Sequence, residues 1–202
     1  MKDMLLNNQI ELIGELSALT FSHATHGYGF YNGIMKVKRL SNVYDEVPVS
    51  ISSEIWDIDN HIPGVRVSVK GQIRTFNRHE GDKSKLIITV HVREISESSL
   101  PDRNDLYLEG YICKRPISRT TPLGREIADL LVAVNRPFGK SDYIPCICWG
   151  RNARFMDLLD VSTKVELHGR FQSRVYNKKV ENGGYVEKTA YEVSAHKMKL
   201  GA

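Results

Sequence analysis

The sequence of 202 residues has only three cysteines, Cys113, Cys146 and Cys148, and all of them lie in its second half. An odd number of cysteines argues against a disulfide framework and favours reduced thiols in a cytoplasmic protein. No apolar run reaches the length of a membrane span, so we expect no insertion in a membrane. The opening residues, 1–8, are too short and too polar a stretch for a secretory signal.

The sequence also lacks a recognisable catalytic or metal-binding constellation. No nucleophile, base and orienting group occur together, and the carboxylates are scattered rather than clustered as a metal-dependent nuclease would need them. The pair Cys146-x-Cys148 has poor spacing for zinc, and His23-x-x-His26 has no further ligands nearby. We therefore expect a protein without enzymatic activity, cofactor or metal, with a nuclease kept as an alternative.

The most informative feature present is an internal repeat. Val37-Lys38-Arg39 with Asp45 and Pro48 recurs, 97 residues later, as Val134-Asn135-Arg136 with Asp142 and Pro145. Glycines follow the same repeat: Gly27 corresponds to Gly124, Gly14 to Gly110, and Gly71 to Gly169. Two units of about 100 residues are too few and too long for a solenoid and indicate two copies of one small domain.

A polar, proline-containing stretch between the two units, residues 96–102, is typical of a linker. It predicts a first domain at residues 1–98, called the first copy, and a second domain at 102–202, called the second copy. Residues 1–101 contain 11 Lys and Arg against 12 Asp and Glu, whereas residues 102–202 contain 17 against 12. The second copy is therefore the candidate for binding an anionic partner.

Most segments alternate between apolar and polar residues, which predicts strands with one buried face. Examples are residues 65–71 and 164–170, and Asn182-Gly183-Gly184 is a strong hairpin signal. One segment, residues 152–159, instead places Phe155, Leu158 and Leu159 on one face of a short helix. Strands with one helix in about 100 residues predict an all-β protein of two tandem five-stranded OB barrels, each with one short helix. Another small barrel or a sandwich is the alternative.

Strand parity in the second copy groups aromatic and basic side chains on faces that need not be core. Tyr143 and Trp149 share one face, and Arg136 shares a parity with Phe138. On the next long strand the shared face carries Arg170, Gln172, Arg174 and Tyr176. Aromatic rings stack unpaired bases while Arg and Lys neutralise phosphates, so this mixture favours a site for single-stranded nucleic acid. Ordinary barrel packing of these rings is the alternative.

The second copy resembles bacterial single-stranded DNA-binding proteins along almost its whole length. The resemblance rests on residues 104–116, 121–124, 131–136, 142–150 and 164–174, in the family's order. It implies an OB fold and sequence-tolerant binding of single-stranded DNA in replication, recombination or repair. Base stacking is implied at Phe138, Tyr143, Trp149 and Tyr176. We add the nearby basic residues Arg136, Arg151, Arg170, Arg174 and Lys178 as candidates for phosphate contacts.

The first copy departs from this pattern, because its matching positions hold Ser41, Glu46, Ser52 and Arg78. Its own aromatic residues lie elsewhere, so we expect an assembly or accessory domain. The family mostly forms rings of four OB folds, which implies a homodimer of this tandem chain. Replication or recombination proteins are implied as partners. The alternative is a primosomal or recombination accessory OB protein that acts mainly through protein partners.

Overall fold

The computed structural model describes residues 6–81, 83–121, 123–156, 158–179 and 183–201. The described part of the first copy contains six strands: β1 (Asn8–Leu16), β2 (Thr20–Thr25), β3 (Tyr28–Lys38), β4 (Tyr44–Ser52), β5 (Arg66–Glu80) and β6 (Lys83–Glu97). That of the second copy contains β7 (Arg103–Ile112), β8 (Ile117–Thr120), β9 (Glu126–Asn135), β10 (Ser141–Trp149), β11 (Lys164–Lys179) and β12 (Tyr185–Leu200). The expected all-β architecture is confirmed.

Each copy closes into a five-stranded barrel. In the first copy the order is β3-β4-β6-β5-β1, and β1 closes the barrel by pairing with β3. In the second copy β7, β11, β12, β10 and β9 follow the same order, and β7 closes on β9. The pairs β4–β6 and β10–β12 are parallel. Apolar side chains that alternate along these strands fill both interiors, as the period-two pattern requires.

The glycines of the repeat lie where barrel strands approach too closely for a side chain. A Cβ atom on Gly14 would stand 2.3 Å from the carbonyl oxygen of Lys36, and one on Gly110 would stand 2.4 Å from that of Ala133. Gly71 and Gly169 meet the neighbouring strand in the same way. These positions therefore match between the copies because barrel closure excludes a larger residue.

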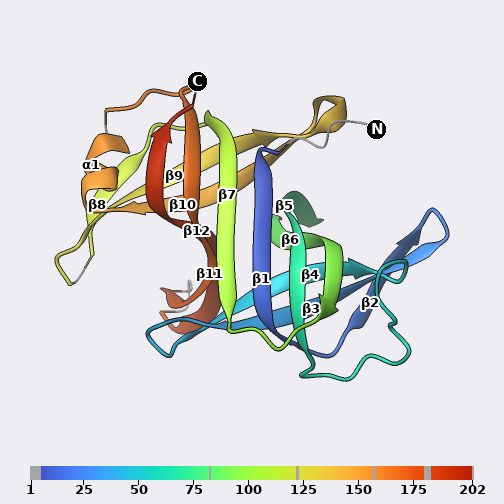
Figure 1. Ribbon diagram of the computed structural model, residues 1–202. Helices are drawn as coiled ribbons and strands as arrows, with labels where there is room; N and C mark the ends of the chain where they lie inside the picture. Colours follow the sequence, from blue (N-terminus) through green and yellow to red (C-terminus); the bar gives the residue numbers. More distant parts are fainter. Residues whose placement is uncertain (1–5, 82, 122, 157, 180–182, 202) are drawn as a thin grey trace.

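The two barrels are joined edge to edge. Strand β1 pairs antiparallel with β7, from Asn8 opposite Leu108 to Ile13 opposite Arg103, and the two strands lie side by side in Figure 1. The connecting residues are held as well, because Arg66 donates hydrogen bonds of 2.9 and 2.7 Å to the carbonyl oxygen of Leu100. One continuous sheet thus runs through both copies.

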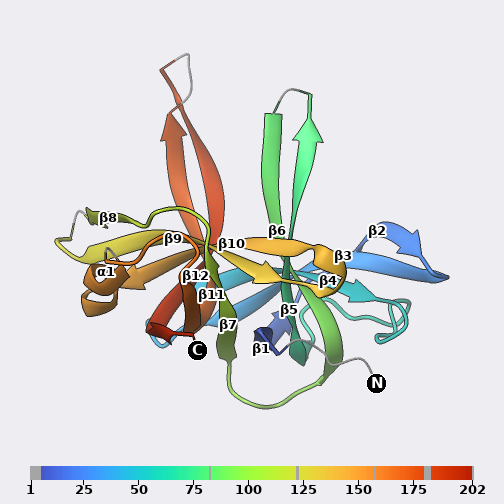
Figure 2. The same cartoon turned by 90° about the horizontal axis from the view of Figure 1, so that it is seen from above.

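Two long hairpins extend from the barrels on the same side of the molecule (Figure 2). We call β5–β6 the first finger and β11–β12 the second finger. Strands β11 and β12 pair up to Lys179 opposite Tyr185, so the expected hairpin is present. Its turn at Asn182 lies outside the described residues.

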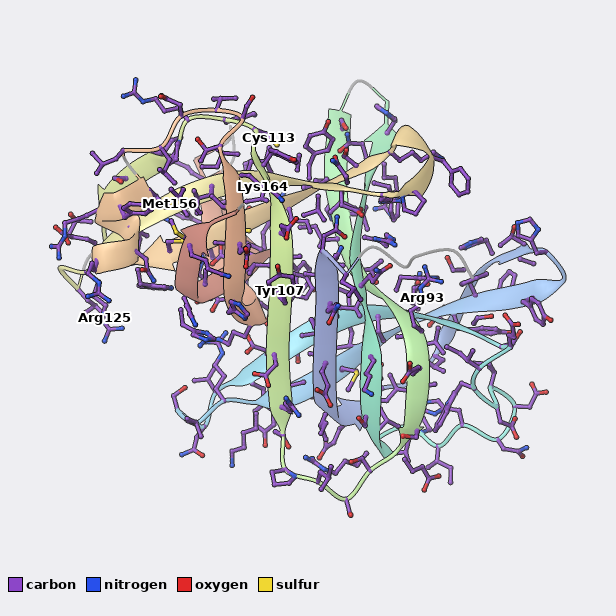
Figure 3. The ribbon with its side chains drawn as sticks, turned by 45° about the horizontal axis from the view of Figure 1, so that its top comes forward. Arg93, Tyr107, Cys113, Arg125, Met156 and Lys164 are labelled. Atoms are coloured by element: carbon purple, nitrogen blue, oxygen red, sulfur yellow. The ribbon has the colours of Figure 1, made fainter. Side chains whose placement is uncertain are left out.

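The short helix differs from its prediction. Among the residues that the structure describes, an α-helix, α1 (Arg151–Met156), forms only in the second copy, whereas residues 53–64 of the first copy form turns and bends. Its buried side chains are Ala153 and Met156, and Met156 is labelled in Figure 3. Phe155 and Leu158 are exposed. The prediction of the apolar face was wrong for Phe155 and Leu158, because the helix ends at Met156 before the periodicity can apply, whereas Leu159 packs against the core.

Candidate nucleic-acid interface

The repeated arginine and aspartate form two matching clasps between the copies. Asp142 is fully buried and accepts a hydrogen bond of 2.6 Å from Arg136 Nε. The same carboxylate accepts from the backbone N–H of Thr75 at 2.6 Å and from Arg74 Nη1 at 3.0 Å. Arg136 Nη2 also donates to the Thr75 carbonyl oxygen at 3.0 Å. The second copy thereby holds strand β5 of the first.

The first copy holds strand β11 of the second with the corresponding residues. Asp45, also fully buried, accepts from Arg39 Nε at 2.9 Å and from the backbone N–H of Ser173 at 3.2 Å. Arg39 Nη2 donates to the Ser173 carbonyl oxygen at 3.2 Å. The hydrogen bond with Asp45 raises the pKa of Arg39. Each copy thus holds the other through the same motif, and the guanidinium of Arg136 is bound within these contacts.

An open groove of about 1140 Å³ lies where the second copy meets the β3–β4 turn of the first. Trp149, Arg170 and Arg174 line it, so the structure brings three of the predicted site residues together. The groove contains seven basic side chains against four carboxylates, which favours an anionic ligand. The basic residues are Lys38, Arg39, Arg103, Arg119, Arg125, Arg170 and Arg174.

Trp149 ends strand β10 and is half-buried, with its indole Nε1 donating a 3.0 Å hydrogen bond to Ser194 Oγ on β12. This bond and the parallel pairing of β10 with β12 fix the ring in the groove. A ring that is held in place loses little conformational freedom when a base stacks on it.

Arg170 stands beside this ring on β11. Its Nε makes no hydrogen bond within the described residues and lies 3.9 Å from Asp45. Burial, followed by the nearby charge of Arg39, lowers the pKa of Arg170. The Arg170 side chain as a whole is 41% exposed, so its outer guanidinium edge can reach a phosphate oxygen in the groove.

Sequence reasoning missed several basic groove residues, among them Arg119 and Arg125, which flank the β8–β9 turn. Arg119 Nε lies 2.5 Å from an Asp129 carboxylate oxygen, whereas Arg125 projects from the end of the hairpin (Figure 3). The predicted turn at 121–124 was the available signal, because residues on both sides of a hairpin turn reach the same rim.

The remaining predicted residues lie outside the groove. Phe138 is 84% exposed in the turn Pro137–Gly139 and has a φ of 65°. Tyr143 is half exposed, and its backbone N–H donates a 2.9 Å hydrogen bond to Thr75 Oγ1. Both residues lie on the β9–β10 hairpin, whose backbone contacts the first copy at Tyr143.

The second finger carries Arg174, Tyr176 and Lys178 on exposed positions. The guanidinium carbon of Arg174 is 5.7 Å from the centroid of the Tyr176 ring, a cation–π distance. Arg151 is exposed at the start of α1. The predicted residues therefore occupy the groove, the junction with the first copy, the finger and the α1 terminus.

The fold and this groove define a tandem OB-fold protein with an aromatic and basic surface. Residues 103–200 match the Single-strand binding protein family. This segment, the second copy, is therefore similar to that family, as the resemblance predicted.

Two curated relatives agree with this match. The chain is 32% identical over 81 residues to a single-stranded DNA-binding protein of Halalkalibacterium halodurans, covering 37% of this chain and 48% of that protein. It is 34% identical over 80 residues to single-stranded DNA-binding protein 3 of Listeria innocua, covering 36% of this chain and 50% of that protein. The chain thus spans about half the length of the curated relatives it matches.

The fold resembles the crystal structure of the single-stranded DNA-binding protein from Thermus aquaticus, with a TM-score of 0.70 and 19% identity. The superposition covers 96% of this chain and 93% of the other. The likeness extends over both copies and supports the tandem OB architecture.

The described part of the chain contains no helix with the length and apolar character of a membrane span.

Proposed function

We propose that this chain binds single-stranded DNA without sequence preference through its second copy. The observation that carries the proposal is the ring of Trp149, fixed in a groove with seven basic side chains. The ring stacks a base, and Arg170, Arg174 and Arg125 neutralise phosphates. The match of residues 103–200 to the Single-strand binding protein family supports the same ligand class.

The strand continues from the groove onto the second finger and the β9–β10 hairpin. Arg174, Tyr176 and Lys178 extend the surface along β11, and Tyr143 and Phe138 extend it toward the first copy. Their exposure leaves the rings accessible to bases. Arg151 adds a charge beside the groove, and Arg136 supports the surface through its clasp on Asp142.

Binding rather than catalysis is the activity we propose, in replication, recombination or repair, in the reducing cytoplasm that free Cys146 and Cys148 favour. We also propose a homodimer with four OB folds, as the family resemblance implies. Light scattering of the purified chain tests it, with an expected mass twice the 23.0 kDa of one chain. A mass of one chain at micromolar concentration would contradict the dimer.

The first experiment follows tryptophan fluorescence during titration with poly(dT). Stacking predicts strong quenching of Trp149, whereas Trp56 responds little because it packs against the core and bonds to His61 at 3.3 Å. Trp149→Ala is expected to cost roughly 1–3 kcal/mol of binding free energy, measured by anisotropy of a labelled oligonucleotide.

Two control variants separate the possible causes. Trp56→Phe should keep the quenching, and Trp149→Phe should keep most of the affinity, because it retains a ring and loses only the bond to Ser194. Quenching that persists in Trp149→Ala and vanishes in Trp56→Phe would refute the proposed site.

A further inference from the structure

We infer that the first copy carries a second stacking surface for unpaired bases, built on Phe30 of β3 and Phe76 of the first finger. The inference rests on the proposed function, because it assumes that the second copy already holds the strand. The matching positions of the first copy hold Ser52 and Arg78 in place of Trp149 and Tyr176. In both cases an aromatic ring stands at an adjacent position of the same surface.

The first difference concerns one cross-strand pair, in which the aromatic residue lies on one strand in the second copy and on the other strand in the first copy. In the second copy Ile127 on β9 pairs with Trp149 on β10. In the first copy Phe30 on β3 pairs with Ser52 on β4. The ring has changed strand within the pair, a displacement of about 5 Å. Both Phe30 and Trp149 are half-buried, so each presents part of its ring to solvent.

Phe30 is held by two other rings, as Trp149 is held by Ser194. The Phe30 centroid lies 5.0 Å from that of His23, with an interplanar angle of 6°, and 6.0 Å from that of His91, with an angle of 23°. His91 takes the place of Ser194, because Ser50 pairs with His91 as Ile147 pairs with Ser194. Rings from β2, β3 and β6 thus form one row with Phe30 in the middle, and a base reaches Phe30 by replacing the exposed His23 ring.

Charge also suits this row to a base rather than a cation. Burial, reinforced by Arg93, Arg74 and Arg136, lowers the pKa of His91 to about 4. The imidazole is therefore neutral near pH 7 and contributes a flat polar surface beside Phe30. Of these arginines, Arg74 and Arg136 are bound to Asp142, whereas Arg93 is exposed and supplies positive charge for a phosphate.

The second exchange lies on the fingers. The second finger carries Arg174 and Tyr176, two residues apart on one face of β11. The corresponding face of β5 in the first finger carries Phe76 and Arg78, the same pair in the opposite order. Phe76 is 54% exposed and Tyr176 is 37% exposed. Since both fingers project on the same side (Figure 2), one strand can contact both.

A third aromatic ring is also displaced from its matching position, near the junction between the copies. The position that matches Tyr143 holds Glu46, but Tyr44 lies two residues away on the same exposed face of β4, with the same exposed fraction of 49% as Tyr143. Strand β4 contacts β11 through the bond from Glu46 N to Ser173 Oγ, just as Tyr143 N bonds to Thr75 Oγ1. Tyr44 thus continues the surface toward the second copy.

The test uses the full chain with two labelled thymidine oligonucleotides, one of about 10 nucleotides and one of about 40. A single OB fold holds about 4–16 nucleotides, so the first ligand fills one copy and the second spans both. Phe76→Ala and Phe30→Leu should leave the affinity for the short ligand unchanged. Each should weaken the long ligand roughly five-fold or more, the loss of one stacked base. Phe30→Leu keeps apolar volume in the row but removes the flat ring.

Leu100→Ala is the matched control, because this exposed apolar side chain lies in the β6–β7 connection, on the opposite side from the fingers (Figure 2). It should change neither affinity, and circular dichroism checks that every variant is folded. Unchanged long-ligand affinity in Phe76→Ala and Phe30→Leu, with both affinities lowered in Trp149→Ala, would overturn the second surface and leave the proposed function standing. Absence of Trp149 quenching by either ligand would overturn the proposed function and this inference with it.

Discussion

The two copies agree where they hold each other and differ where they face solvent. Arg39 and Asp45 occupy the same places as Arg136 and Asp142, and each pair forms hydrogen bonds with the backbone of the opposite copy. In contrast, the rings Tyr143, Trp149 and Tyr176 correspond to Glu46, Ser52 and Arg78. Packing and interlock therefore account for the repeat, and the ligand surface accounts for the divergence.

This comparison shows what kind of constraint a repeat records. A buried carboxylate that accepts from a guanidinium and a backbone N–H has few tolerable substitutes. A stacking ring needs only a flat face near the strand, so it can change its position on the surface. The repeat at residues 37–48 and 134–145 therefore reflects the contacts that hold the two copies together.

The largest expected effect comes from breaking one clasp. Asp142→Ala removes the acceptor for Arg136, Arg74 and Thr75 and leaves two guanidinium groups without their counterion. We expect a loss of about 3–5 kcal/mol in the free energy of unfolding, measured by urea titration. Asp45→Ala should cost less, because its second arginine, Arg170, is 3.9 Å away.

Glu94→Ala is the control for this experiment. It removes an exposed ion pair with Lys70, whose atoms are 3.6 Å apart, and should change stability by about 0–1 kcal/mol. Equal losses for Asp142→Ala and Glu94→Ala would show that the clasps do not hold the copies together.

Much of this architecture could be predicted from the sequence because its cause is local. Period-two patterns placed the strands, and parity placed Trp149, Arg170 and Arg174, which share the groove. The tandem OB fold also followed from the repeat and from the family resemblance.

The remaining features depend on contacts between residues far apart in the chain. Arg136 was predicted to face a phosphate, but its carboxylate partner and the Thr75 carbonyl are fixed only after the copies dock. Phe30 could not be recognised as a counterpart of Trp149, because parity does not reveal which residue on the neighbouring strand lies opposite. The face of α1 was misassigned because six residues make less than two turns.

A second prediction concerns how the stability of the protein depends on pH through one position that differs between the two copies. His91 has a pKa lowered to about 4, mainly by burial, whereas its counterpart Ser194 does not titrate. In the unfolded chain His91 binds a proton near pH 6.5, so stability is fully present above that value and falls as the pH drops toward 4. Between these limits we expect His91 to account for a loss on the order of 1–3 kcal/mol.

Urea unfolding at pH 7 and pH 4.5 measures this loss, with His91→Gln as the reference. The variant cannot bind the proton, so its stability should fall less with acid than that of the parent chain. The same pH dependence in both proteins would mean that His91 is not responsible.

The smallest expected effect separates two arginines that the sequence treats alike. For single strands the logarithm of the binding constant falls with the logarithm of salt concentration by about 0.7 per neutralised phosphate. Arg174→Ala, on the exposed finger, should reduce this slope by about 0.7. It also removes an ion pair of 3.4 Å with Glu192, but Gln172 still donates to that carboxylate, so the unfolding free energy should fall less than in Arg136→Ala. Arg136→Ala should leave the slope unchanged and lower the unfolding free energy, because its guanidinium is bound to Asp142. If Arg136→Ala reduces the slope as Arg174→Ala does, Arg136 contacts the strand directly, and the clasp would then serve the ligand as well as the interface.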